Sequence, residues 1–325
     1  MAYDLEFERP LSDIEKQIHG IERKGEKMKA EDRTQVRELR QRLDHRTDEI
    51  YRALTPWQRV QVARHKDRPY THDYIKLMCD DFFELRGDRR HGDDRAILGG
   101  IASLDGKTVM ILGNQKGRDT KEKVECNFGL AHAEGYRKAQ RIMRQAERFH
   151  LPVVTLIDIS GASPDLEAEQ RGIAGAIAEN LQVMAVLRTP VLAIVIGEGG
   201  SGGALGISVA DRILMLEHAI YTVASPEAAA SILWRDAAFA SSAAEAMKIT
   251  APDLLELRLI EEIIPEPRGG AHHDHRAAAD AVKAAILRNI GELEQLPMEE
   301  LLEHRYRRYR DIGAYTREPI GAASV

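Results

Sequence analysis

Five glycines fall within seven residues, from Gly197 to Gly203, and Ser201 lies between two Gly-Gly pairs. The apolar run Val191–Ile196 precedes them and is rich in β-branched residues, which predicts a buried strand. Residues 204–209 indicate the start of a short buried helix. A glycine turn between strand and helix presents free backbone N–H groups at the positive end of the helix, and without a Cβ a ligand can come close. The segment predicts a site for an oxyanion or enolate; the simpler alternative is a turn that needs glycine for its shape.

The same glycines contain a second chemical pattern. Residues 199–203 satisfy G-x-S-x-G, in which Ser201 would be a nucleophile on a strained turn. A hydrolase would also need a later acid and a histidine, for example Asp211 or Asp253 with a histidine from residues 272–275. The pattern is short and no other hydrolase feature accompanies it, so stabilisation of an anion by backbone amides is the preferred interpretation.

A basic turn offers another place for a charged ligand. Lys116 and Arg118 flank Gly117 directly after a predicted strand. Two cations beside a glycine could hold a phosphate or a carboxylate. They could equally pair with Asp119 and Glu122, and the sequence leaves both alternatives open.

Two further clusters are expected to be solvated. One is basic, with a phosphorylated ligand or an acidic partner as the alternative, and consists of Arg59, Arg64, Lys66 and Arg68. The other lies in a polar loop and has metal-ligating side chains: His272, His273, Asp274 and His275. Because adjacent residues rarely share one tetrahedral ion, no metal is predicted in this chain.

Composition narrows the class of protein. The chain has 325 residues, a net charge of −6 and two cysteines. The acidic balance argues against nucleic acid as the primary ligand, and two cysteines argue against a disulfide framework and for a reducing compartment. The acidic N-terminus lacks the apolar core of a signal peptide, and no apolar run approaches the roughly 20 residues of a membrane span. A cytoplasmic protein is expected.

Hydrophobic periodicity predicts an α/β chain between two helical regions. An amphipathic helical hairpin covers residues 11–54, and a short helix at 57–64 and a longer one at 73–85 follow. Asp105-Gly106 predicts a hairpin between two strands. Expected strands are 96–104, 107–112, 151–158, 191–196, 211–216, 219–223 and 259–264; expected helices are 134–150, 166–187, 228–234, 242–247, 252–257, 276–293 and 298–309. A nucleotide-binding sheet would need G-x-G-x-x-G or a Walker A lysine after a strand, and neither is present in register.

Several stretches resemble one protein family. The chain is similar to the α subunit of the bacterial acetyl-CoA carboxylase carboxyltransferase, in RPYTHDYIKLM (68–78), LGGIASLDGKTVMILGNQKGRDTKEK (98–123), NFGLAHAEGYRKAQRIM (127–143), GEGGSGGALGI (197–207), SPEAAASILW (225–234) and IIPEPRGGAH (263–272). The resemblance covers almost the whole chain. It implies a crotonase-like fold, the ClpP/crotonase superhelix of ββα units, over residues 95–265. An N-terminal helical region at 1–94 and C-terminal helices with a tail at 266–325 would flank it.

The resemblance also implies a reaction. CO₂ passes from carboxybiotin, held on a separate carrier protein, to acetyl-CoA and gives malonyl-CoA for fatty-acid synthesis. Gly202 and Gly203 correspond to the oxyanion hole that stabilises the ureido oxygen. The other residues expected on the carboxybiotin side are Gly161, Ala162, Gly199, Gly200 and Ser201. The freed biotin nitrogen would take the methyl proton, so a Glu, His or Cys base is not expected.

The implied partners are a β subunit that carries a zinc ribbon, the biotin carboxyl carrier protein and biotin carboxylase, with the two carboxyltransferase subunits in an α2β2 assembly. Contacts are expected through the helices near 166–187 and 226–234. One turn departs from the family: residues 159–165 read ISGASPD, where T-P-G-A-Y-P-G is usual after the aspartate. Asn114 and Ala228 also replace family residues. These changes motivate the alternative of a non-catalytic paralogue, or one with another acyl-CoA preference.

Overall fold

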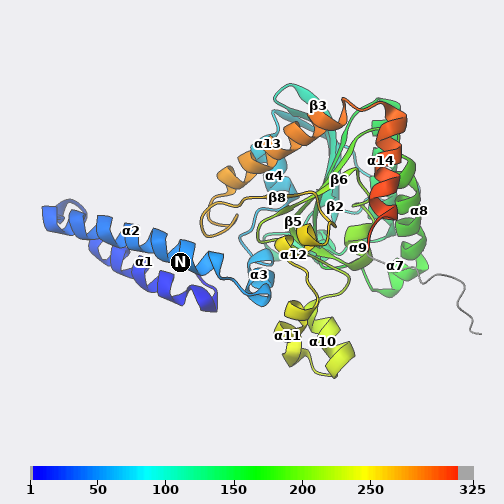
Figure 1. The fold of residues 1–325 in the computed structure, drawn as a ribbon. Helices are drawn as coiled ribbons and strands as arrows, with labels where there is room; N and C mark the ends of the chain where they lie inside the picture. Colours follow the sequence, from blue (N-terminus) through cyan, green and yellow to red (C-terminus); the bar gives the residue numbers. More distant parts are fainter. Residues whose placement is uncertain (1–2, 314–325) are drawn as a thin grey trace, which may run out of the picture.

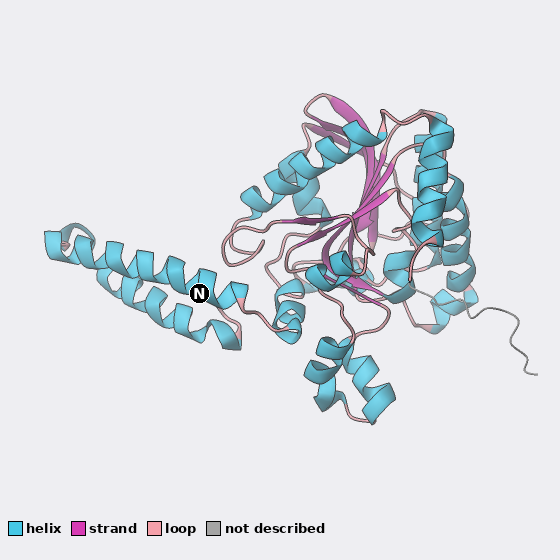
Figure 2. Cartoon of the chain, in the orientation of Figure 1, coloured by secondary structure: helices cyan, strands magenta, loops and turns pink. Residues whose placement is uncertain are grey.

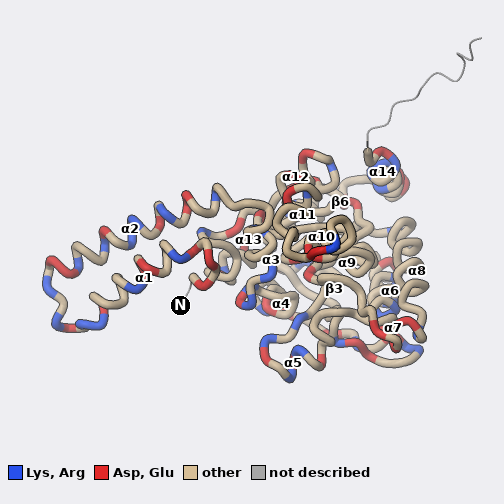
Figure 3. Tube along the Cα trace, turned by 90° about the horizontal axis from the view of Figure 1, so that it is seen from below, with Lys and Arg blue, Asp and Glu red and all other residues tan. Residues whose placement is uncertain are grey.

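A charged helical hairpin projects from the body of the molecule in the computed structural model, which describes residues 3–313 (Figures 1 and 3). Its helices are α1 (Arg9–Glu22) and α2 (Ala30–Arg52), with the short turns η1 (Glu6–Glu8) and η2 (Gly25–Lys27). The apolar stripes of the two helices pack mainly on each other, through Ile14, Ile18, Val36 and Leu39. The predicted hairpin is therefore confirmed.

The segment after the hairpin differs from its prediction. Helix α3 (Pro56–Ala63) is present, but the helix expected at 73–85 is α4 (Thr71–Met78) followed by strand β1 (Asp81–Glu84). Strand β1 pairs antiparallel with β2 (Ile97–Leu104), and its side chains alternate between exposed and half-buried. Helical periodicity across these residues misled the prediction because pairing with a distant strand overrides local propensity.

One sheet of eight strands forms the centre of the molecule (Figure 2). The strands lie in the order β1-β2-β3-β4-β5-β6-β8, and β7 pairs with β5. The sheet is antiparallel from β1 to β3 and parallel from β3 onward. The remaining strands are β3 (Lys107–Asn114), β4 (Val153–Ile159), β5 (Val191–Gly200), β6 (Arg212–Leu216), β7 (Ile220–Thr222) and β8 (Glu262–Ile264).

Two sequence signals explain the centre of this sheet. Asp105 and Gly106 have φ values of 48° and 78°, as the predicted hairpin turn between β2 and β3 requires. Every residue of β4 and β5 is buried. Parallel strands covered on both faces carry near-continuous apolar runs, which is why these two were recognisable from the sequence.

Helices cover both sides of the sheet, α4 and α13 on one side and α8 and α14 on the other (Figure 1). After α4 the helices are α5 (Thr120–Glu125), α6 (Ala133–Arg148), α7 (Leu166–Gln170), α8 (Ile173–Val186), α9 (Ser201–Leu205), α10 (Pro226–Trp234), α11 (Ala240–Ala246), α12 (Ala251–Glu256), α13 (His275–Leu293) and α14 (Met298–Arg310), with the turns η3 (Asn127–Gly129) and η4 (Ala237–Phe239). The single helix predicted at 166–187 is wrong, because Gly172 adopts φ 74° between α7 and α8. Within residues 3–313, no helix has both the length and the apolar character to cross a membrane.

Candidate active site

Strand β5 leads directly into helix α9 at the glycine-rich segment. The strand runs through Gly200, four residues beyond the predicted end, because residues 198–200 pair with β7. The helix begins at Ser201, not at 204. The prediction of a glycine turn over 197–203 is therefore wrong in extent, since its first four residues continue the strand.

Close packing explains the glycines within the strand. A Cβ on Gly200 would lie 2.1 Å from the carbonyl oxygen of Ser160, and a Cβ on Gly199 would lie 2.7 Å from the Tyr221 ring. Neither distance is compatible with a side chain. Their glycine identity thus follows from packing, and their contact with a substrate stays a prediction.

The chain reverses sharply at Ser201, which is exposed and has φ 53°. Gly202 and Gly203 then form the first turn of α9, where backbone N–H groups have no acceptor within the helix. Among the described residues, no side chain caps this end. The far side of α9 is held in place: the Tyr136 hydroxyl donates to the Gly203 carbonyl at 3.0 Å, and Asn180 Nδ2 donates to the Gly206 carbonyl at 3.0 Å.

The turn after β4 packs against this helix start. A Cβ on Gly203 would lie 2.5 Å from the backbone nitrogen of Ala162 and 2.6 Å from the carbonyl carbon of Gly161. By contrast, a Cβ on Gly202 would approach only Ile177 Cδ1, at 4.0 Å, and one on Gly161 would meet nothing described within 4 Å. The structure therefore brings Gly161, Ala162, Gly202 and Gly203 to one place and leaves space beside two of them.

Asp165, the last residue of the 159–165 turn that departs from the family pattern, is hydrogen-bonded by neighbouring residues. Asp165 accepts hydrogen bonds from Ser163 Oγ at 2.6 Å and from the Ala168 amide at 2.7 Å, and it lies 2.9 Å from His132 Nε2. The bond from Ser163, with the Ala168 amide and His132, lowers the pKa of Asp165 to about 2. The charge serves as the N-cap of α7, so the altered turn remains ordered beside α9.

The two basic residues of the 115–118 turn are both paired with carboxylates. Lys116 Nζ donates to Oδ1 of Asp158 at 2.6 Å, and this carboxylate also accepts from the Glu198 amide at 3.0 Å. Arg118 contacts Asp73 and lies 4.0 Å from the centre of the Tyr70 ring. Ion pairing was one of the two alternatives, but the predicted partners, Asp119 and Glu122, were wrong. A contact with a phosphate or carboxylate of a ligand stays a prediction.

Two arginines from the α3–α4 region bind the end of β5, and the sequence did not predict this role for either. Arg64 binds Glu198 and Glu227, each at 2.6 Å. Arg68 Nε donates to the Ile196 carbonyl at 2.7 Å. The solvated face predicted for this basic cluster is wrong for these residues. A glutamate inside a buried apolar strand was the available signal, because a buried charge needs a partner.

Arg68 also forms a fully buried ion pair with Glu266. Its two terminal nitrogens lie 2.8 and 2.6 Å from the two carboxylate oxygens, and both side chains are essentially inaccessible. Burial alone raises the pKa of Glu266, but the Arg68 charge and the amide of His218 lower it to about 2. The arginine therefore links the loop 265–274 to the strand that carries the glycines.

The structure argues against the hydrolase pattern. Asp211 is bound by Arg305 at 2.8 and 2.7 Å, and Asp253 accepts from Thr250 Oγ1 at 2.6 Å. The histidines are also engaged elsewhere: His272 stacks on His65 and His275 contacts the Asp67 carbonyl. Both candidate acids are thus bound by other residues, so a triad with Ser201 lacks its acid.

A family model for acetyl co-enzyme A carboxylase carboxyltransferase-like proteins matches residues 4–313. The chain belongs to this family. It is 52% identical to the acetyl-coenzyme A carboxylase carboxyl transferase subunit alpha of Prochlorococcus marinus MED4, over 96% of this chain and 93% of that protein. It is 51% identical to the subunit of the same name from Geobacter metallireducens, over 96% and 98%.

Solved structures support the fold of this carboxyltransferase family member. A malonate decarboxylase heterotetramer from Pseudomonas aligns with a TM-score of 0.57 at 17% identity, over 73% of this chain and 94% of that chain. The transcarboxylase 12S core aligns with a TM-score of 0.54 at 17% identity, over 80% and 45%. The predicted crotonase-like α/β fold is confirmed.

Proposed function

We propose that this chain is the α subunit of an acetyl-CoA carboxyltransferase, which transfers CO₂ from carboxybiotin on a carrier protein to acetyl-CoA. The proposal rests on sequence identity of 52% and 51%, over 96% of the chain, to two proteins named as this subunit. The alternative of a non-catalytic paralogue rested on the altered 159–165 turn. Asp165 is the N-cap of α7 and accepts a hydrogen bond from the Ala168 amide. Since its charge is used within the turn, the altered turn gives the paralogue alternative no support.

The residues at the start of α9 suit the carboxybiotin side of this reaction. Carboxybiotin, when bound, supplies the CO₂ and a ureido oxygen on which negative charge develops. The open space at Gly202 and Gly161 lets a ligand oxygen approach, while the tight contact of Gly203 with Ala162 fixes the helix start. Amides of Gly202 and Gly203 would stabilise that charge without titrating, which is the role of an oxyanion hole.

The remaining predicted residues receive supporting roles. Gly199 and Gly200 let β5 approach its neighbours, and Ser201, with φ 53°, begins α9 directly before Gly202 and Gly203. Lys116 neutralises Asp158 at the end of β4. Arg118 anchors the segment before α4 by donating to the carbonyls of Lys66 and Arg68. A direct contact of either cation with a substrate would require an ion pair to break.

The alpha-subunit family implies a β-subunit partner, and the surface supports one. Helices α10 and α11 protrude from the body of the molecule (Figure 1). Large apolar side chains are exposed on α10 and the adjoining turn η4: Ile232, Leu233, Trp234 and Phe239. Leu166 and Val186, at the ends of the α7–α8 region, are 71% and 65% exposed. We assign both surfaces to subunit contacts in an α2β2 assembly, with a biotin carboxyl carrier protein and biotin carboxylase as further partners and the cytoplasm as the location.

Reconstitution tests the proposal. The chain is co-purified with its β subunit and assayed for malonyl-CoA formed from acetyl-CoA and a carboxybiotin donor. We expect turnover by the complex and none by this chain alone. A complex that forms and is inactive with acetyl-CoA, but active with a longer acyl-CoA, would overturn the assigned substrate. A complex inactive with every acyl-CoA would favour the paralogue.

A further inference from the structure

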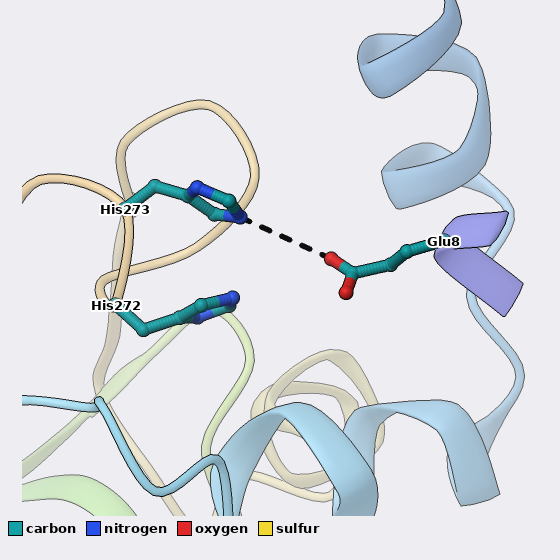
Figure 4. A group of neighbouring side chains, drawn as sticks. All are labelled: Glu8, His272 and His273. Atoms are coloured by element: carbon teal, nitrogen blue, oxygen red, sulfur yellow. Dashed lines mark ion pairs between the residues drawn. The ribbon is translucent and has the colours of Figure 1, made fainter. Parts of the chain in front are cut away.

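Three side chains from segments far apart in the sequence lie close together (Figure 4). Glu8 comes from η1, at the entrance to α1, and His272 and His273 come from the loop before α13. One potential ligand atom from each lies within 4.8 Å of the other two. His273 Nε2 and Glu8 Oε1 are 3.9 Å apart, too far for a hydrogen bond.

The polar atoms of this cluster are buried and poorly satisfied. The Glu8 side chain is fully buried. Both ring nitrogens of His272, and Nε2 of His273, are inaccessible and find no hydrogen-bond partner among residues 3–313. Buried polar groups without partners are rare and costly, so such a group calls for an explanation. The sequence prediction that this histidine cluster is solvated is therefore wrong for His272 and His273.

We propose that Glu8, His272 and His273 form a binding site for one divalent transition-metal ion, of the Zn²⁺ type. Adjacent residues rarely share one ion, but here the two imidazole rings lie side by side with centres 4.4 Å apart, and Glu8 lies next to both. Two imidazoles and one carboxylate are a donor set that Zn²⁺ and Co²⁺ accept, whereas Mg²⁺ and Ca²⁺ prefer oxygen alone. Ligands of one tetrahedral zinc stand roughly 3.4 Å apart at the usual bond lengths. Binding therefore requires the side chains to rotate and bring the ligand atoms, now within 4.8 Å of one another, closer together. Water would complete the coordination.

Two hydrogen bonds hold the Glu8 carboxylate in position. The Tyr51 hydroxyl donates to Glu8 Oε1 at 2.5 Å, and the Leu5 amide donates to Oε2 at 3.0 Å. Such outer hydrogen bonds orient ligating carboxylates.

The site would fasten the N-terminal hairpin to the catalytic body. His272 stacks on His65 with ring centres 4.0 Å apart, and the Ala271 amide donates to Glu266 at 2.7 Å. Glu266 in turn binds Arg68, which holds the end of β5. At His272 the charges of Arg68 and Glu266 act in opposite senses, the first disfavouring and the second favouring a cation. The inference is independent of the reaction that the chain catalyses.

Metal binding to the full chain, with any polyhistidine tag removed, tests this site. The protein is stripped with a chelator and titrated with Zn²⁺ by calorimetry and with Co²⁺ by visible absorption. We expect one equivalent of Zn²⁺, the intense visible bands of tetrahedral Co²⁺, and a higher Tm with Zn²⁺. Glu8→Gln keeps an acceptor for Tyr51 but removes the ligand charge, and should weaken Zn²⁺ binding at least about tenfold.

Glu49→Gln is the matched control, because Glu49 lies beside His45 on the exposed face of α2. It should bind Zn²⁺ as the unchanged protein does. His273→Asn provides a second ligand variant if Glu8→Gln fails to fold, and the Co²⁺ spectrum of the unchanged protein needs no variant. Less than one equivalent of Zn²⁺ at micromolar concentration, an octahedral Co²⁺ spectrum, or equal binding by Glu8→Gln and Glu49→Gln would refute the site.

Discussion

Adding a single methyl group at Gly203 should reduce turnover strongly while the protein still folds. In Gly203→Ala the new Cβ would stand 2.5 Å from the Ala162 nitrogen, whereas ordinary contact begins at 3.4 Å. The obstructing atoms belong to the backbone, so no side chain can rotate away. The 160–165 turn and the start of α9 must therefore move apart by about 0.9 Å, the difference between these two distances.

The two consequences of this shift differ in size. Overpacking of this kind costs about 1–3 kcal/mol of folding free energy, less than the roughly 5–15 kcal/mol that stabilises a domain, so the variant should fold. A displacement of about 1 Å is large for an oxyanion site, where loss of one donor costs about 3 kcal/mol. Turnover should consequently fall by a factor of about 10² to 10³ while assembly with the β subunit persists.

Malonyl-CoA formation by the reconstituted complex measures the first effect, and thermal unfolding measures the second. Gly291→Ala is the control, since it adds the same methyl inside α13, where nothing described lies within 4 Å of the new Cβ. Its activity should be unchanged and its stability equal or greater, because alanine favours a helix. The reasoning fails if a folded, assembled Gly203→Ala complex keeps more than a third of the activity, or if Gly291→Ala loses as much.

Three further predictions concern other parts of the structure. Ser201→Ala should reduce turnover by less than a few-fold, and a fluorophosphonate probe should leave Ser201 unlabelled; stoichiometric labelling would restore the hydrolase interpretation. Arg68→Met should lower the free energy of unfolding in urea by about 3–5 kcal/mol, because it leaves Glu266 buried and unpaired; a loss below 1 kcal/mol would contradict this. Since the folded pKa of Glu266 is depressed to about 2, its contribution should be complete above the unfolded pKa near 4.5 and disappear as pH falls toward 2, and Arg68→Met should lack this part of the acid transition. Leu233→Asp should leave the Tm unchanged but abolish co-purification with the β subunit, because Leu233 is 66% exposed on α10; retained binding would remove α10 from the interface.

Local sequence signals were enough to predict several strands and the helical hairpin of this protein. Apolar runs identified β4 and β5, Asp105-Gly106 identified the β2–β3 hairpin, and heptad-like spacing identified the helical hairpin. The clustered glycines marked the passage from β5 into α9, where the first backbone N–H groups have no acceptor within the helix. Each signal acts within a few residues, so it can be recognised without knowing the path of the chain.

Only the tertiary structure decided how distant segments meet. Arg64 and Glu198 are 134 positions apart, and Arg68 and Glu266 are 198 apart, so no spacing rule could pair them. Pairing of β5 with β7 extended the strand through Gly200, and pairing of β1 with β2 replaced the end of a predicted helix. Glu8 lies near His272 and His273 because its segment packs against α2, where the Tyr51 hydroxyl donates to Glu8. Burial is the physical reason, because a charge removed from water needs a partner and only the folded chain brings that partner into contact.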